Sequence, residues 1–262
     1  MTPRRRPQPF RVAIIGKGGS GKSVLAGTLA RVLARRGHRV LALDSDAMPG
    51  LALSIGLGAI DRALLQDFAE QGPEGRWRIV RGLKPATVIR RAAIPGPDGV
   101  LFLQFGKMDS PSLGPVMSSL QAFWMVTKDL SHGPWTVIHD LPAGTRQPFA
   151  GWAASPDLFL LVVEPTQKSI LSARRLVGVA ETTPGSRLVV AVNKVARPDD
   201  AELVAGAIGS APLVGVVPLD EAVVAAEKEG VAPIDRSPRS PAVLAVKELA
   251  RELESLAMRE VS

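Results

Sequence analysis

The stretch Gly16–Ser23 has the sequence GKGGSGKS and lies between an apolar run, RVAII, and a segment with helical periodicity, VLAGTLARVLARRG. The apolar run (11–15) has the composition of a buried β-strand. The leucines of the following segment (24–37) recur every four residues, as they do along one face of an α-helix. That helix is expected to stop at Gly37. Strand, glycine-rich turn and helix together predict the first unit of an α/β fold.

The same alternation of strand and helix continues along the chain. Strands are expected at 10–16, 39–44, 99–106, 135–140, 157–164, 187–193 and 212–218, and helices around 60–70, 116–130, 167–180, 199–208, 219–228 and 241–258. Several of the strands are uninterrupted apolar runs, which is typical of strands buried on both faces. The pattern predicts a single α/β domain with one mostly parallel, twisted sheet flanked by helices. We expect a basic arm over 1–10 and the domain over 11–262, with its last helix (241–258) docked on the body or on a partner.

Composition excludes several classes of function. The 262 residues include no cysteine, which excludes disulfides, thiolate catalysis and cysteine-bound metal clusters. The start of the chain, MTPRRRPQPF, is basic and interrupted by proline, unlike a signal peptide. The longest apolar run, LFLLVV at 158–163, is far below the ~18 residues of a membrane span. We therefore expect a cytoplasmic protein. Its formal charge of +7 allows an anionic partner without identifying one.

The glycine-rich stretch matches the pattern of a P-loop, Gly-x-x-x-x-Gly-Lys-Ser. Small residues let backbone N–H groups turn inward around phosphate oxygens, with the N-terminus of the next helix behind them. Lys22 is expected to neutralise the β- and γ-phosphates, and the Ser23 hydroxyl to ligate Mg²⁺. The residues predicted to bind the nucleotide here are Gly16, Gly18, Gly19, Ser20, Gly21, Lys22, Ser23 and Val24.

Acidic residues follow two of the expected strands. Asp44 and Asp46 come after the second strand, and Asp140 follows the strand WTVIHD, with Gly144 four residues on. In open α/β sheets ligands bind at these strand ends. A carboxylate there can complete the Mg²⁺ shell or orient the attacking water, which is the work that phosphoryl transfer leaves to the protein. We assign catalysis to Lys22, Asp46 and Asp140 and metal binding to Ser23, Asp46 and Asp140.

Three further residues near this site have roles that the sequence defines less closely. Asp44 is interpreted as structural or outer-shell, although either it or Asp46 could act in hydrolysis. Gly144 is expected to offer its backbone N–H to the γ-phosphate. The three histidines show no metal-binding spacing, and His139 is interpreted only as a neighbour of Asp140.

The strand RLVVAVN ends in Asn193-Lys194-Val195-Ala196. GTP-binding P-loop proteins usually recognise guanine with an Asp two residues after the Lys of such a pair, and Ala196 stands at that position. Without a carboxylate to accept the N–H groups of guanine, ATP is favoured over GTP. Asn193 is expected to bond the exocyclic amine of adenine.

With these motifs in place, the chain resembles the deviant-Walker ATPases: ParA, MinD, the nitrogenase iron protein and the CooC nickel-insertion ATPases. GKGGSGKS is similar to their phosphate loop, DSDAMPG to switch I with Ala47 in place of the usual Pro, and DLPAG to switch II of MinD. The segment VVEPTQKSILSARRL (162–176) is similar to CooC, and VPLDEAV (217–223) resembles the adenine-side loop. The likeness runs from about residue 11 to residue 230.

The resemblance implies further roles. It implies that Lys17 acts in catalysis by reaching the phosphates of a partner subunit in an ATP-sandwiched homodimer. It also implies that Asn193, Lys194, Pro218 and Asp220 line the adenine side. The cysteine motif of CooC is missing: Ser112 and Gly114 stand where its thiolates would be. Neither nickel carriage by that motif nor electron transfer through a cluster is therefore implied.

Two surfaces have alternative interpretations. The range 75–97 holds no acidic residue and six basic ones: Arg76, Arg78, Arg81, Lys84, Arg90 and Arg91. Together with Arg4, Arg5 and Arg6 they could hold DNA non-specifically, as ParA proteins do, or be an ordinary solvated face. Trp77 could stack on a base or simply pack. The C-terminal helix mixes Glu with Lys and Arg, so membrane binding is not expected.

The expected activity is a slow, Mg²⁺-dependent ATP hydrolysis used as a dimerisation switch. Three purposes remain open: a CooC- or MinD-like ATPase that handles a client protein or assembly, a ParA-like positioning ATPase that binds DNA in its ATP form, and a nucleotide-binding scaffold that does not hydrolyse. The sequence does not identify the client.

Overall fold

A central sheet of eight strands organises the part of the chain that the computed structural model describes. The described residues are 7–46, 50–60, 65, 67–105, 113–144, 147–149, 153 and 155–259. The strands are β1 (Arg11–Gly16), β2 (Val40–Asp44), β5 (Ile94–Pro95), β6 (Leu101–Gln104), β7 (Thr136–Asp140), β8 (Leu158–Val163), β9 (Leu188–Val195) and β10 (Leu213–Pro218). Their order is β10-β9-β8-β1-β7-β2-β6-β5, and every neighbouring pair is parallel except β5 with β6. The predicted fold class is confirmed.

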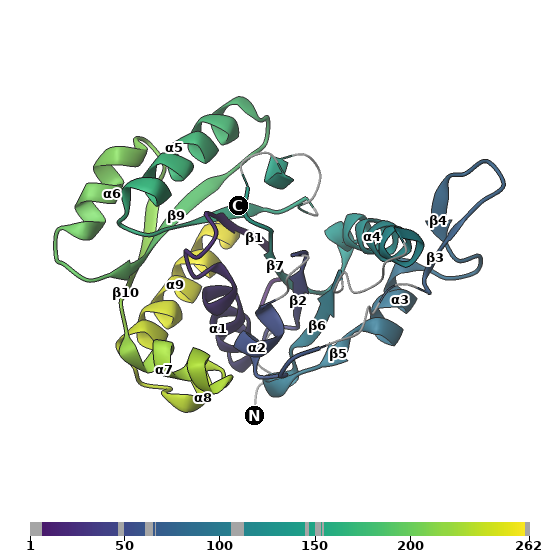
Figure 1. Ribbon diagram of the computed structural model, residues 1–262, viewed down its shortest axis with the longest axis horizontal. Coiled ribbons are helices and arrows are strands. Elements are labelled where there is room, and N and C mark those ends of the chain that lie inside the picture. The colour runs from purple at the N-terminus through teal and green to yellow at the C-terminus, as the bar shows by residue number, and fades with distance from the viewer. Residues whose placement is uncertain are drawn as a thin grey trace.

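Helices cover both faces of the sheet (Figure 1). One face carries α1 (Lys22–Arg35), α2 (Leu51–Ile55), α7 (Glu221–Glu229), α8 (Pro233–Arg236) and α9 (Pro241–Met258); the other carries α3 (Pro85–Ala92), α4 (Leu113–Lys128), α5 (Gln167–Thr182) and α6 (Asp200–Ile208). Successive residues of β1 alternate between the two: Val12 and Ile14 pack in the α1 core, Ala13 and Ile15 in the α5 core. Burial on both faces explains the uninterrupted apolar runs.

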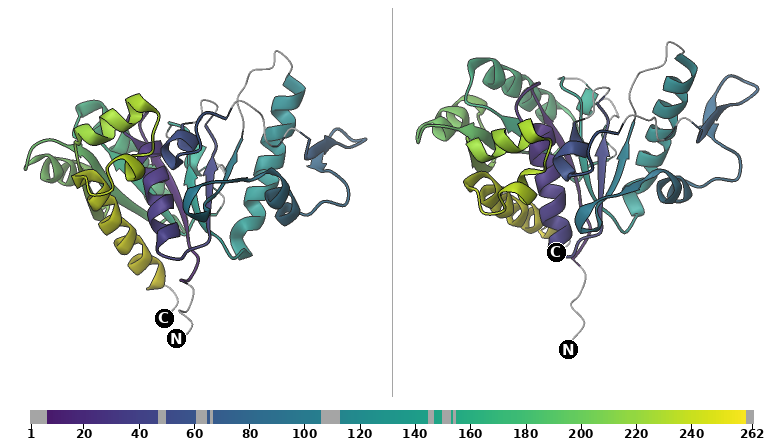
Figure 2. Two further views of the ribbon diagram at one scale, coloured as in Figure 1. Left: turned by 90° about the horizontal axis from the view of Figure 1, so that it is seen from below. Right: turned by 60° about the horizontal axis from the view of Figure 1, so that its bottom comes forward.

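The expected helix around 60–70 is wrong where the structure describes it. Ala69–Gln71 is strand β3, which pairs antiparallel with β4, Trp77–Ile79. Gly75 adopts a positive φ of 75° in the connecting turn, and the N–H of Gly72 donates to the carbonyl of Arg76 at 2.9 Å. The hairpin projects beyond α3 and α4 in every view (Figures 1 and 2). Its turn glycines outweigh the local helical pattern.

Both ends of the domain pack against its body. The expected arm extends too far, because Phe10 is only 3% exposed in the α1 core and its carbonyl accepts from the N–H of Val137. Arg4–Arg6 lie outside the described residues. Helix α9 docks on the body, where it buries Val243, Leu249 and Leu253 against α1 and β10. None of the described helices combines the length and apolarity needed to cross a bilayer.

Gly27 marks a tight contact between α1 and α2. A Cβ at this position would lie 2.6 Å from the backbone carbon of Ser54. We expect Gly27→Ala to lower the free energy of unfolding by about 1–3 kcal/mol, because the added methyl pushes α2 away. This is opposite in sign to the gain of up to ~1 kcal/mol that helix propensity alone gives.

Gly178→Ala in α5 is the matched control, since a Cβ there meets nothing within 4 Å. Chemical denaturation of both variants checks the prediction. If the two substitutions shift the unfolding midpoint in the same direction, the close α1–α2 packing does not hold.

Candidate functional site

The loop Gly16–Ser23 joins β1 to α1 in a conformation that requires glycine. A Cβ on Gly16 would overlap the carbonyl oxygen of Val162 in β8, and one on Gly21 would overlap the side-chain amide of Asn193. Gly16, Gly19 and Gly21 all have positive φ values. Gly21 is the N-cap of α1, and no side chain caps the helix there. The loop therefore surrounds a space that the N-terminus of a 14-residue helix faces. The free N–H groups and the positive end of the helix dipole favour an anion in that space.

Lys22 brings a buried positive charge to this loop. The residue is 8% exposed, and its Nζ donates to the carbonyl of Lys17 at 3.3 Å. Burial lowers the pKa of Lys22, and the charges of Asp140 and Asp46 act in the opposite direction. A phosphate group bound in the loop would place negative charge beside this ammonium and favour its charged form.

Two carboxylates meet the loop from the neighbouring strands β2 and β7. Asp44 and Asp140 are register partners and are both buried. Burial raises the pKa of Asp140, and the charge of Asp44 raises it further, while its hydrogen bond with Ser23 lowers it. Oδ1 of Asp140 has no hydrogen-bond partner among the described residues. An unsatisfied buried oxygen beside the Ser23 hydroxyl is what a site for a hard cation offers.

Asp44 shapes the backbone that follows β2. Its Oδ1 accepts from the N–H of Asp46 and its Oδ2 from the N–H of Leu51, both at 3.0 Å. The carboxylate thus anchors the start of α2, in agreement with its interpretation as structural. Asp46 lies close enough to Lys22 for its charge to raise the pKa of that lysine. Ala47 lies outside the described residues.

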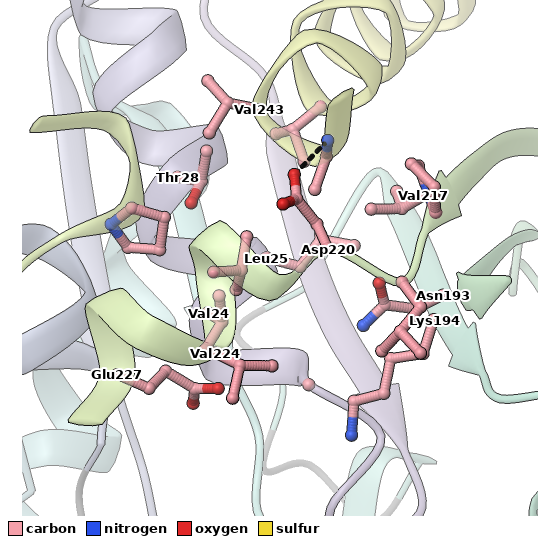
Figure 3. A pocket seen from close by; sticks show the side chains of 17 residues that line it. Val24, Leu25, Thr28, Asn193, Lys194, Val217, Asp220, Val224, Glu227 and Val243 are labelled. Atoms are coloured by element: carbon pink, nitrogen blue, oxygen red, sulfur yellow. Dashed lines mark hydrogen bonds between the residues drawn. The ribbon is translucent and has the colours of Figure 1, made fainter. Parts of the chain in front are cut away.

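The structure brings the predicted adenine-side residues together in one pocket beside the loop (Figure 3). Asn193 donates from Nδ2 to the carbonyl of Ser20 at 2.8 Å, so an adenine amino group could bond only to its amide oxygen. Asp220 accepts from the N–H groups of Ala222 and Ala242 at 2.9 and 3.0 Å. Its carboxylate therefore caps α7 and also binds the first turn of α9, and so joins two elements of the pocket wall. Pro218 also lines the pocket.

Sequence reasoning missed most of the remaining pocket wall. These residues come from four helices: Leu25 and Thr28 of α1, Val223, Val224 and Glu227 of α7, Pro233 of α8, and Ala242, Val243 and Val246 of α9. One signal was present, since Val24 and Thr28 are four residues apart on the helix that follows the loop. The α9 residues carried no such signal because their helix begins about 220 residues later in the chain.

The other predicted residues are also placed. Lys17 is half-buried, and its Nζ donates to the carbonyl of Gly18 at 3.0 Å. A Cβ on Gly18 would lie 3.6 Å from Cβ of Ala143, so the segment 140–144, with Gly144, lies against the loop. Within 106–115, where a CooC-type motif would fall, residues 106–112 with Ser112 lie outside the described residues, whereas Gly114 belongs to α4.

The residues fit a magnesium–nucleotide complex better than a cation held by protein alone. Within the described ranges, no three Asp, Glu or His side chains form a metal cluster. Mg²⁺ is commonly held by one or two carboxylates together with phosphate oxygens and water. Ser23 and Asp140, which are hydrogen-bonded to each other, could supply such a partial shell beside the phosphate loop.

This geometry is that of a P-loop nucleotide-binding domain. The profile of the CobQ/CobB/MinD/ParA nucleotide binding domain matches residues 12–234, and the chain belongs to that family. The carbon monoxide dehydrogenase accessory protein CooC of Rhodospirillum rubrum is 28% identical over 241 residues, which cover 87% of this chain and 91% of CooC. An uncharacterised ATP-binding protein of Methanocaldococcus jannaschii is 30% identical over 236 residues, covering 83% of this chain and 88% of that protein.

The septum site-determining protein MinD of Pyrococcus horikoshii, solved with Mg-ADP, superposes with a TM-score of 0.73 at 21% identity. The match covers 95% of this chain and 98% of that protein. The predicted relationship to ParA, MinD and CooC is confirmed. The predicted nucleotide and Mg²⁺ cofactors are confirmed at the level of the family.

His139 lies one residue before Asp140 and is fully buried. Neither ring nitrogen has a hydrogen-bond partner among the described residues, and the ring lies 5.7 Å from that of Phe123. Burial lowers the pKa of His139 from 6.5 to about 3. The folded protein therefore keeps this imidazole uncharged, whereas the unfolded chain protonates it below about pH 6.5.

It follows that His139 costs stability in acid. Between pH 6.5 and 3 the unfolded state binds a proton that the folded state does not, so stability is lost as the pH falls. Compared with His139→Leu, the parent should lose up to ~1.4 kcal/mol more per pH unit in this window. Denaturation curves at several pH values measure the difference. Equal pH slopes for the two proteins would mean that the folded state accepts the proton.

Proposed function

We propose that this protein hydrolyses ATP with Mg²⁺ and that its ATP-bound form is a homodimer that acts as a switch on a client protein or assembly. The observation that carries the proposal is the convergence of Lys22, Ser23 and Asp140 at the start of α1. A buried ammonium, a hydroxyl and a carboxylate with an unsatisfied oxygen are the groups that a magnesium–triphosphate needs. Membership of the nucleotide-binding family supports it.

The residues divide the work of hydrolysis. Lys22 and the N–H groups of the loop hold the phosphates, while Ser23 and Asp140 hold the cation. When bound, Mg²⁺ neutralises phosphate charge and favours attack at the γ-phosphate. Asp46 orients the attacking water and can accept its proton. Gly144, on the segment that lies against the loop, offers its N–H to the γ-phosphate.

Lys17 is the residue that supports a dimer. Lys22 already places one ammonium inside the loop, whereas that of Lys17 rests on the carbonyl of Gly18 at the outer side. A second lysine in this position can reach the phosphates of a facing subunit. The related CooC and MinD proteins carry out accessory and site-determining roles in their own organisms, which favours a client over a metabolic substrate.

Two substitutions separate these roles. We expect Asp46→Ala to bind ATP and dimerise but to hydrolyse at least ~10²-fold more slowly, because a general base contributes ~10²–10⁴ to the rate. Lys17→Gln should bind ATP and stay monomeric. ATP turnover and light scattering with and without ATP measure both effects.

Glu248→Gln, at an exposed position on α9, serves as the control for both variants. An Asp46→Ala protein that hydrolyses ATP like the parent would remove the catalytic assignment. A parent that is monomeric with and without ATP would contradict the dimer. A parent that binds ATP without hydrolysing it would indicate the scaffold alternative.

A positioning ATPase that binds DNA is the second candidate, favoured by the basic surface on β4, the following turn and α3. Its six residues, Arg76, Arg78, Arg81, Lys84, Arg90 and Arg91, are all exposed. Arg78 pairs with Glu70 at 3.0 Å and Arg76 faces Glu74 at 3.9 Å, so part of the charge is neutralised locally. Trp77 is half-buried and packs in the core beneath α4, which leaves it less able to stack on a base.

Binding to non-specific duplex DNA at two salt concentrations, with and without ATP, tests this candidate. A DNA-positioning protein should bind only with ATP, and log K should fall by about 0.9 per log unit of salt for each phosphate contacted. Replacing Lys84, Arg90 and Arg91 together by Gln should then weaken binding to all sequences alike. Absence of ATP-dependent binding would rule out the positioning function and leave the client-handling one.

A further inference from the structure

Two consecutive carbonyls of the phosphate loop are held from outside by the end of β9. Nδ2 of Asn193 donates to the carbonyl of Ser20 at 2.8 Å, and Nζ of Lys194 donates to that of Gly19 at 2.6 Å. In a trans peptide the C=O and the following N–H point in opposite directions. Fixing the Ser20 carbonyl outward therefore turns the N–H of Gly21 toward the inside of the loop. Residues that sequence reasoning assigned to the base also shape the phosphate cradle.

Lys194 reaches this position at a conformational cost. Its φ of +60° lies in the left-handed region, which is uncommon for residues other than glycine. Such strain persists only where surrounding contacts fix it, and it is concentrated at functional sites. The lysine side chain is 42% exposed and has four rotatable bonds, so a single carbonyl contact would not keep its ammonium in place.

The second contact of that ammonium is Glu164. Oε1 of Glu164 lies 2.6 Å from Nζ of Lys194, and the Glu164 side chain is only 15% exposed. Its backbone directly follows β8 and is fixed on both sides: its N–H donates to Oγ of Ser169 at 3.0 Å, and its carbonyl accepts from the N–H of Thr166 at 2.7 Å. A largely buried carboxylate on a fixed stretch of backbone thus sets the position of the ammonium at the end of a long side chain.

We propose that Glu164 is a positioning residue of the nucleotide site: it holds the Lys194 ammonium on the carbonyl of Gly19 and so preorganises the phosphate loop. Glu164 acts through Lys194 and does not itself need to touch the nucleotide. The inference rests on the proposed binding of a nucleotide at this loop. It adds to the site a carboxylate from β8, a strand to which neither the P-loop pattern nor the two acidic strand ends assigned a role.

Titration of Mg-ADP by calorimetry tests the inference without involving hydrolysis. Glu164→Gln keeps the shape and removes the charge, and we expect the Kd for ADP to rise about fivefold to tenfold, as for loss of a charge-assisted hydrogen bond. If Glu164 acts through Lys194, the double variant Glu164→Gln/Lys194→Gln should bind ADP like Lys194→Gln alone. Glu164→Asp retains the charge and should fall between the parent and Glu164→Gln.

Glu254→Gln is the matched control, because its carboxylate is similarly exposed (20%) and forms an ion pair of similar length, to Arg36 at 2.5 Å, at the opposite end of α1 from the loop. Its Kd should equal that of the parent, and its Tm shows what loss of a comparable pair does to stability. An unchanged or tighter Kd in Glu164→Gln would overturn the proposal, as would additive effects in the double variant. Glu164→Gln could also prove less stable than the control variant. In that case Glu164→Asp decides: if it binds ADP no more tightly than Glu164→Gln, the proposal is overturned. A parent that does not bind ADP would refute the proposed function itself.

Discussion

At Gly16 the backbone leaving β1 passes so close to β8 that the carbonyl oxygen of Val162 occupies the place of a side chain. At Gly21 the backbone presses equally closely on the amide of Asn193. Two close approaches, a few residues apart, hold the loop against β8 and β9. They explain why the start of α1 faces an enclosed space at the tips of the strands, and why the neighbouring strands supply the groups around it.

Lys22 and Asp140 bring opposite charges into the buried space at the start of α1. Burial disfavours the charged forms of Lys22 and of Asp140 at the same time, and Asp44 adds a second carboxylate next to Asp140. A folded chain with these groups and no ligand carries an electrostatic penalty. A polyphosphate with its cation offers the missing partners to both signs of charge, so binding relieves a cost that folding has imposed.

The loop and the strand-tip acids could be predicted because each depends on a short stretch of chain. Gly16–Ser23 is recognisable from spacing alone, and Asp44 and Asp140 follow from the rule that parallel strands end at one edge. The wall of the base pocket could not be predicted. Glu227 and Val243 are distant from the loop in sequence, and only the packing of α9 and α8 against α1, with α7 against α8, brings them there.

The remaining errors have equally specific causes. The helix expected around 60–70 is replaced at its end by the first strand of a hairpin that the turn glycines allow, and Phe10 packs in the core although it follows a basic, proline-rich start. Asn193 and Asp220 line one pocket beside the loop, but the hydrogen bonds they form are to the protein backbone. A sequence motif identifies which residues gather at a site more readily than which atom each one bonds.

Asp220 connects the last helix, α9, to α7 at the pocket beside the loop. One oxygen of its carboxylate caps α7, the other accepts from the N–H of Ala242 in the first turn of α9, and both helices line the pocket beside the loop. The two walls are therefore joined at a single side chain. The C-terminal helix therefore helps to form the pocket beside the phosphate loop, and a fusion or truncation that displaced the start of α9 would remove the groups that it contributes there.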